Sequence, residues 1–112
     1  MTTGVRVTIA VAKVLRVFLD DIAQPHHGYE LMQLTGFPSG KLYPILARLQ
    51  SAGWLIRESE DIDPVVAGRP ARRFYRLSPH GIQAARTELA TLTELLRPVS
   101  GARRLQPDGG VP

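Results

Sequence analysis

The chain has 112 residues, which is enough for one compact domain with a modest core and too few for two. It carries 14 basic and 10 acidic residues, a net charge of +4, so a polyanion such as nucleic acid is a natural class of partner. The absence of cysteine excludes a disulfide framework and a thiolate metal site.

The apolar N-terminal run is interrupted by basic residues, which argues against a signal-peptide core and a membrane span. We therefore expect a cytoplasmic protein without a membrane partner. Residues 1 to 8 are predicted to form an extended lead-in, because apolar and polar residues alternate there. Helical spacing follows, and it predicts a first helix over residues 9 to 20 with Thr8 as its N-cap.

A second helix is predicted from about His27 to Thr35, with Leu31 and Leu34 on its buried side. His26 and His27 are adjacent and lack the spacing of helical metal ligands, so we expect them to cap this helix and predict no metal. Gly36 stands where a left-handed residue commonly ends a helix. Residues 36–38 are therefore expected to form a tight turn.

A third helix follows this turn and stops at Gly53. Pro44 is tolerated only near a helix start, so regular hydrogen bonding is expected to begin near position 40. This expectation places Lys41 and Tyr43 in the first turn, where free backbone amides favour an anion. The buried side is an i, i+3, i+4, i+7 stripe of Leu42, Ile45, Leu46 and Leu49.

Two strands are predicted over residues 54–59 and 72–77, which are rich in aromatic and branched side chains. They would form a two-stranded hairpin, or wing, with a long loop that begins acidic and ends basic. Trp54 and Tyr75 are expected in the core. Only the basic half of the loop is suited to approach DNA.

Ser78 and Pro79 are a typical N-cap and first residue of a last helix, which ends at Arg97. Ile82, Ala85, Leu89, Leu92 and Leu96 follow a heptad-like spacing and form an apolar seam that requires a partner. Residues 97–112 have little to bury and are expected to be disordered.

These elements predict an α+β fold, mainly helical, in which residues 9–96 form one domain: a helix-turn-helix, a two-stranded wing and a C-terminal dimerisation helix. In such a fold the second helix of the pair enters the major groove by its N-terminal part. Arg69, between Gly68 and Pro70, has the form of a side chain that reaches into a minor groove. Arg72 and Arg73 are adjacent on a strand, so only one is expected to face DNA. The residues expected to contact DNA are His27, Tyr29, Ser39, Lys41, Tyr43, Arg48, Arg69, Arg72 and Arg73.

Each of these signals also has a simpler interpretation. The basic side chains of the third helix could form an ordinary solvated face, and the loop around Arg69 could be a plain surface turn. The chain shows no glycine-rich phosphate loop, nucleophile elbow or converging carboxylate pair, so we predict neither an enzyme nor a cofactor.

Four motifs resemble the PadR-like winged helix-turn-helix transcriptional regulators. They are HGYEL at 27–31, SGKLYPILARL at 39–49, AGWL at 52–55 and GRPARRFYRLSPHG at 68–81. The resemblance covers about residues 8–90, and Phe74 departs from it where a tyrosine is common. The last helix is short, as in the smaller members of that family.

The resemblance implies a homodimer that binds an inverted-repeat operator and represses its own or a neighbouring promoter. It also implies an interface between the first and last helices, for which we expect Val11, Leu15, Phe18, Ile82, Leu89, Leu92 and Leu96. Some relatives are released from DNA by small hydrophobic effectors, and Trp54 would be a candidate to line such a pocket. The alternative function is a protein-interaction module that uses the acidic half of the wing and the last-helix seam.

Overall fold

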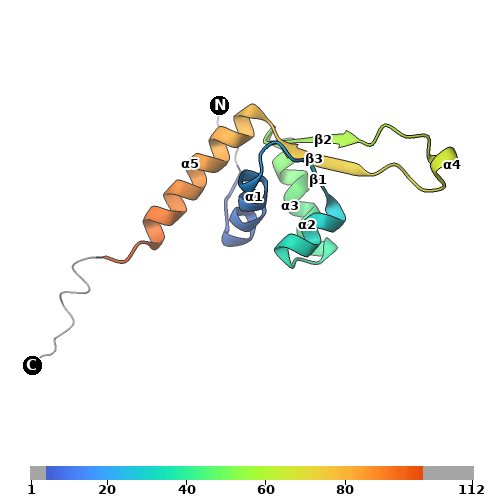
Figure 1. Cartoon of the computed structure of the whole chain (residues 1–112). Coiled ribbons are helices and arrows are strands. Elements are labelled where there is room, and N and C mark those ends of the chain that lie inside the picture. Colours follow the sequence, from blue (N-terminus) through green and yellow to red (C-terminus); the bar gives the residue numbers. More distant parts are fainter. Residues whose placement is uncertain (1–4, 100–112) are drawn as a thin grey trace, which may run out of the picture.

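The computed structural model of the protein describes residues 5–99. Within this range the elements follow the order α1, β1, α2, α3, β2, α4, β3, α5 (Figure 1). Helices α1, α2 and α3 gather beneath a small sheet, the β2–β3 hairpin extends to one side, and α5 projects to the other. No helix in residues 5–99 combines the length and hydropathy that a bilayer crossing requires.

Helix α1 (Ile9–Asp20) has the predicted bounds, and the Thr8 hydroxyl accepts a hydrogen bond from the Val11 amide at 3.2 Å. Val11, Leu15 and Phe18 are each at most 1% exposed, because α1 packs against α2 and α5 of the same chain. The expectation that these three side chains contact a second copy is therefore wrong, since their own core covers them.

Helix α2 (Gly28–Thr35) ends at Gly36, whose φ of 76° is the predicted left-handed conformation. Its buried side runs through Leu31 and Thr35, whereas Leu34 is 53% exposed, contrary to prediction. The Thr35 hydroxyl accounts for which side of α2 is buried, because it donates to the Leu31 carbonyl at 2.7 Å and accepts from the Phe37 amide at 3.1 Å. The short polar side chain thereby fixes the turn into α3.

Helix α3 (Ser39–Ser51) begins earlier than predicted, with Pro38 as its N-cap. The amides of Lys41 and Leu42 both donate to the Pro38 carbonyl at 3.0 Å, so Lys41 lies in the first turn but Tyr43 lies in the second. Pro44 is consequently inside the helix. The predicted apolar stripe of α3 is confirmed as buried.

The sheet has three strands in the order β1-β3-β2, all antiparallel, rather than the two predicted. Strands β2 (Leu55–Ser59) and β3 (Arg73–Leu77) form the hairpin, and β1 (His26–His27) pairs with the other side of β3. The loop of the hairpin contains a short helix, α4 (Pro64–Ala67), which the sequence analysis missed. Trp54 and Tyr75 are buried, as predicted.

Helix α5 (Pro79–Leu96) begins as predicted, with the Ser78 hydroxyl accepting from the Gly81 amide at 2.9 Å. The first half of its seam packs on the core of the chain, where Ala85 is buried and Leu89 is partly buried. The second half is free, since Leu96 is 70% exposed. Residues 1–4 and 100–112, on which parts of the lead-in and tail predictions fall, lie outside the described residues.

Candidate nucleic-acid interface

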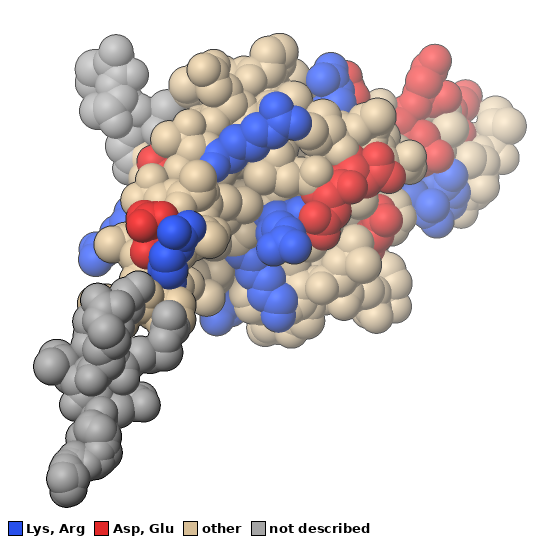
Figure 2. Space-filling model, turned by 60° about the vertical axis from the view of Figure 1, so that its left-hand side comes forward, with Lys and Arg blue, Asp and Glu red and all other residues tan. Residues whose placement is uncertain are grey.

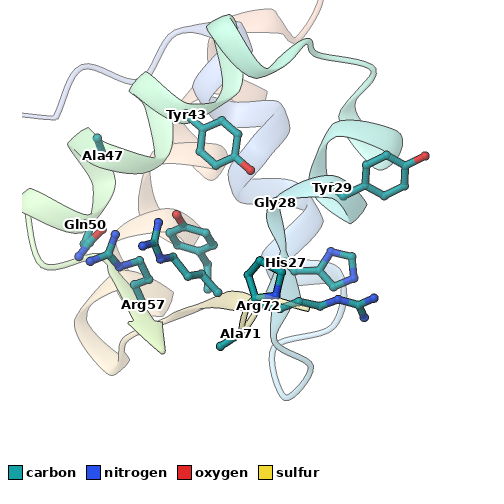
Figure 3. A pocket seen from close by; sticks show the side chains of 12 residues that line it. His27, Gly28, Tyr29, Tyr43, Ala47, Gln50, Arg57, Ala71 and Arg72 are labelled. Carbon is teal, nitrogen blue, oxygen red and sulfur yellow. The ribbon is translucent and has the colours of Figure 1, made fainter. Parts of the chain in front are cut away.

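A groove of about 780 Å³ separates α3 and the start of α2 from the inner part of the hairpin (Figure 3). Helix α2 contributes Tyr29 and α3 contributes Tyr43 and Gln50, whereas the hairpin contributes Arg57, Arg72 and Arg73. Residues far apart in the sequence, from position 27 to position 75, therefore meet at one concave surface. The groove has the polar and aromatic lining that a nucleic acid requires.

The charge of this groove is positive. Among the described residues that line it there are three arginines and no carboxylate. None of these arginines takes part in the ion pairs found within residues 5–99, which in the hairpin join Arg69 to Glu60 and Arg76 to Glu58. A groove of this kind concentrates anions.

The exposed face of α3 divides the predicted contact residues between two flanks. Successive helix residues are 100° apart, so Tyr43, Ala47 and Gln50 share one side, and all three line the groove. Lys41 and Arg48 are seven residues apart and share the opposite flank, where both are exposed. Ser39, the first residue of α3, is also exposed but does not line the groove.

Tyr43 is oriented by Gly28 across the helix pair. A Cβ atom at position 28 would overlap with the Tyr43 hydroxyl, so the phenol ring lies directly on the first turn of α2. The side chain is nevertheless 43% exposed and faces the groove (Figure 3). Because Gly28 has no side chain, the phenol ring of Tyr43 on α3 can occupy this position.

The two histidines have different roles, although both were expected to cap α2. His27 is the N-cap, and its Nδ1 atom accepts a hydrogen bond from the Glu30 amide at 3.2 Å. Its ring also packs edge-on against Phe74, with centroids 5.8 Å apart. His26 is buried, with its ring 5.4 Å from that of Phe18. Only His27 therefore faces the groove.

Arg69 is paired within the wing, so its predicted insertion into a minor groove would require this ion pair to break, and the insertion itself stays a prediction. Its two guanidinium nitrogens donate to the two carboxylate oxygens of Glu60 at 2.8 and 2.9 Å. Glu60 also accepts from the backbone amide of Arg72 at 3.1 Å. The hydrogen bond from Arg69, followed by that from Arg72, lowers the pKa of Glu60 from 4.5 to about 2. The charge of Arg69 is neutralised within the wing.

Arg72 and Arg73 both line the groove, whereas alternation along a strand had predicted that only one would face DNA. Strand β3 begins at Arg73, and Arg72 lies in the preceding loop, so the alternation does not apply to this pair. Arg57 was missed entirely. It pairs with Tyr75 across the sheet, and its position two residues after the buried Leu55 was the signal that could have found it.

A helix pair joined by a tight turn, followed by a hairpin whose arginines flank the second helix, defines a winged helix-turn-helix protein. Residues 14–87 match the model of the Transcriptional regulator PadR-like family. The chain belongs to this family of transcriptional regulators, as its motifs indicated. Membership agrees with the expectation that it is not an enzyme.

One relative and two solved structures show how far the similarity extends. The chain is 39% identical over 77 residues to Transcriptional regulator Rv3488 of Mycobacterium tuberculosis, a match that covers 69% of this chain but only 62% of that protein. A PadR-like regulator from Bacillus cereus has a similar fold, with a TM-score of 0.53 and 18% identity over 81% of this chain and 94% of the other. The S. aureus MepR–DNA complex gives a TM-score of 0.62 and 12% identity over 80% and 67% of the two chains.

Proposed function

We propose that the protein is a dimeric, sequence-specific DNA-binding regulator that represses its own or a neighbouring promoter. The observation that carries the proposal is the groove beside α3, whose three arginines form none of the ion pairs found within the described residues. Phosphate groups are the natural counter-charge for such a surface. The solved MepR structure of similar fold, which is a complex with DNA, supports the same use of this architecture.

In the proposed complex α3 lies in the major groove of the duplex. Tyr43, nearer the N-terminal end of α3, would lie closest to the base edges, and Gln50 follows it on the same side about two turns further along the helix. Arg57, Arg72 and Arg73 would contact the phosphates next to the groove, as guanidinium groups do with high geometric specificity. Ser39, Arg48, Tyr29 and His27 remain candidate contacts at the edges of this surface.

The dimer part of the proposal rests on the free half of α5. Leu95 and Leu96 are 74% and 70% exposed, and Ile9 at the start of α1 is 64% exposed. Ile9, Leu92 and Leu96 line a groove of about 330 Å³ between α1 and α5, whose rim also includes Lys13 and Arg16. A second copy would bury this apolar surface. It would also place the α3 helices of the two copies about one turn of DNA, ~34 Å, apart.

A small hydrophobic effector would act at this same α1–α5 groove. Its lining is mainly apolar, and its volume is at the lower end of ligand pockets, which begin at about 300 Å³. Trp54, which was considered as an effector contact, is 3% exposed in the core and does not line this groove. Binding at the groove would change how the two copies face each other.

Fluorescence anisotropy with labelled DNA from upstream of the gene tests the proposal. We expect tight binding that weakens steeply between two salt concentrations, and weaker binding to a shuffled duplex of equal length. Sedimentation of the complex should give two chains per duplex. A monomeric protein that ignores both duplexes would contradict the proposal and favour the protein-interaction alternative.

A further inference from the structure

The two lysines of the chain converge on one aromatic ring. Lys13 extends from α1 and Lys41 from α3, and their ammonium nitrogens lie 5.4 and 4.7 Å from the centroid of the Phe37 ring. Phe37 belongs to the turn between α2 and α3. In a chain with 14 basic residues, twelve of which are arginine, the remaining two therefore meet at a single point.

This pair of positive charges lacks a counter-charge in the described part of the chain. Neither lysine takes part in the ion pairs found within residues 5–99, and both residues are exposed. An aromatic ring attracts an exposed cation only weakly. Phe37 can thus hold the two ammonium groups in place, but it cannot neutralise them. An anion can.

The lysine pair lies on the flank of α3 that the arginine groove leaves free. Lys41 is two residues from Tyr43, which rotates it by about 200° around the helix and away from the groove. An α-helix with side chains is about 10–12 Å across, and the major groove of DNA is about 12 Å wide. A helix inserted there has a phosphate wall on each flank, and the groove arginines serve only one of them.

We propose that Lys13 and Lys41, held over Phe37, form a second phosphate-binding site that contacts the other backbone of the duplex. The inference rests on the proposed DNA binding and extends it to α1, a helix outside the helix-turn-helix. Lysine suits this role because its compact charge contacts phosphate without the planar geometry that reads a base. The site contributes affinity for any DNA sequence rather than specificity.

The test compares the full-length wild-type protein with Lys13→Gln in anisotropy titrations from about 50 to about 200 mM salt, where each phosphate contact accounts for about a 3.5-fold change in affinity. We expect Lys13→Gln to bind more weakly at every salt concentration. Between the two salt concentrations the affinity of the wild type should fall by a factor about 3.5 times as large as the factor for Lys13→Gln, because the variant makes one phosphate contact fewer. The same difference should appear with specific and shuffled duplexes, because phosphates are common to both.

Arg76→Gln is the matched control, since it removes one positive charge at a residue that is already paired with Glu58 at 3.2 Å and lines neither groove. It should follow the wild type in affinity and salt dependence. Phe37→Leu should weaken binding part of the way, because it releases both lysines while leaving their charge. Thermal unfolding of each variant separates a loss of folding from a loss of contact.

If Lys13→Gln and Arg76→Gln have the same affinity and the same salt slope as a wild type that binds DNA, the second site is wrong and the proposed function stands. A wild type that binds neither duplex would overturn both. A Lys13→Gln variant with lowered thermal stability but an unchanged salt slope would assign Lys13 a purely structural role and would also overturn the site.

Discussion

The inner and outer parts of the hairpin use the same residue type in different ways. In the inner part, Arg57, Arg72 and Arg73 line the groove, and their guanidinium groups form none of the ion pairs found within residues 5–99. Further out, Arg69 is held by both oxygens of Glu60. Arg69 and Arg72 are only three residues apart in sequence, so the number of basic residues does not locate a binding surface. What distinguishes the two parts is whether the guanidinium group itself is held in an ion pair.

The Glu60–Arg69 pair belongs to a set of hydrogen bonds that stabilises the conformation of the hairpin loop. Glu60 accepts a hydrogen bond from the Arg72 amide as well as from Arg69, and its own amide donates to the Arg72 carbonyl at 2.7 Å. These contacts fix the chain at the point where Arg72 and Arg73 enter β3. Glu60 therefore holds the chain where Arg72 precedes β3, while Arg69 only compensates the charge of Glu60.

Replacement of a groove arginine should have the largest effect on DNA binding. We expect Arg73→Ala to weaken binding by about 10-fold or more, because hydrogen bonds to charged groups contribute about 1.5–3 kcal/mol. Arg69→Ala should weaken binding by only about 2-fold, since an exposed ion pair contributes little and its charge is already neutralised. Anisotropy titrations of both variants against one duplex measure the difference.

The two variants remove the same charge from neighbouring parts of one hairpin, so each is the control for the other. Equal losses for Arg69→Ala and Arg73→Ala would show that net charge governs binding. A larger loss for Arg69→Ala would restore the original idea of an arginine that enters the minor groove.

Gly28→Ala should have the next largest effect, although position 28 carries no charge. The new methyl group would overlap with the Tyr43 hydroxyl, so the phenol ring must leave its position on α2. We expect a loss of affinity similar to that of Tyr43→Ala, with a cost in stability of about 1–3 kcal/mol from overpacking.

A double-mutant cycle isolates this contact. Gly28→Ala combined with Tyr43→Ala should bind DNA no more weakly than Tyr43→Ala alone, because the clash has lost its partner. Additive losses would mean that Gly28 acts independently of Tyr43, for example through the backbone of α2.

Much of the helical scaffold could be predicted because its signals are local. Thr8 and Ser78 cap helices through contacts three residues away, and Gly36 adopts the left-handed conformation that glycine favours. Leu34 was misplaced because α2 has only eight residues, little more than two turns, and so short a pattern does not show which edge of the helix the core will cover.

The features that escaped prediction depend on contacts between distant residues. Strand β1 has only two residues, too few for any periodicity, and exists because His26 and His27 meet Tyr75 and Phe74. The neutralisation of Arg69 depends on Glu60, nine positions earlier across a loop that contains an unpredicted helix. The candidate site could thus be predicted as a set of residue types, while the division between bound and free arginines required the fold.

The ion pair in the wing makes a smaller prediction about pH. The pKa of Glu60 is lowered from 4.5 to about 2, so its charged form is favoured by folding. The stabilisation is complete above pH 4.5 and is lost as the pH falls through about 2. In chemical denaturation, wild type should therefore be more stable than Glu60→Gln at neutral pH, and this advantage should decline across that acidic range.

Asp61→Asn removes the same charge from the adjacent exposed residue, and its difference from wild type should vary less over the same range. If the advantage over Glu60→Gln did not change with pH, the carboxylate would not be held by Arg69 in solution, and the contrast between outer and inner arginines would lose its electrostatic basis.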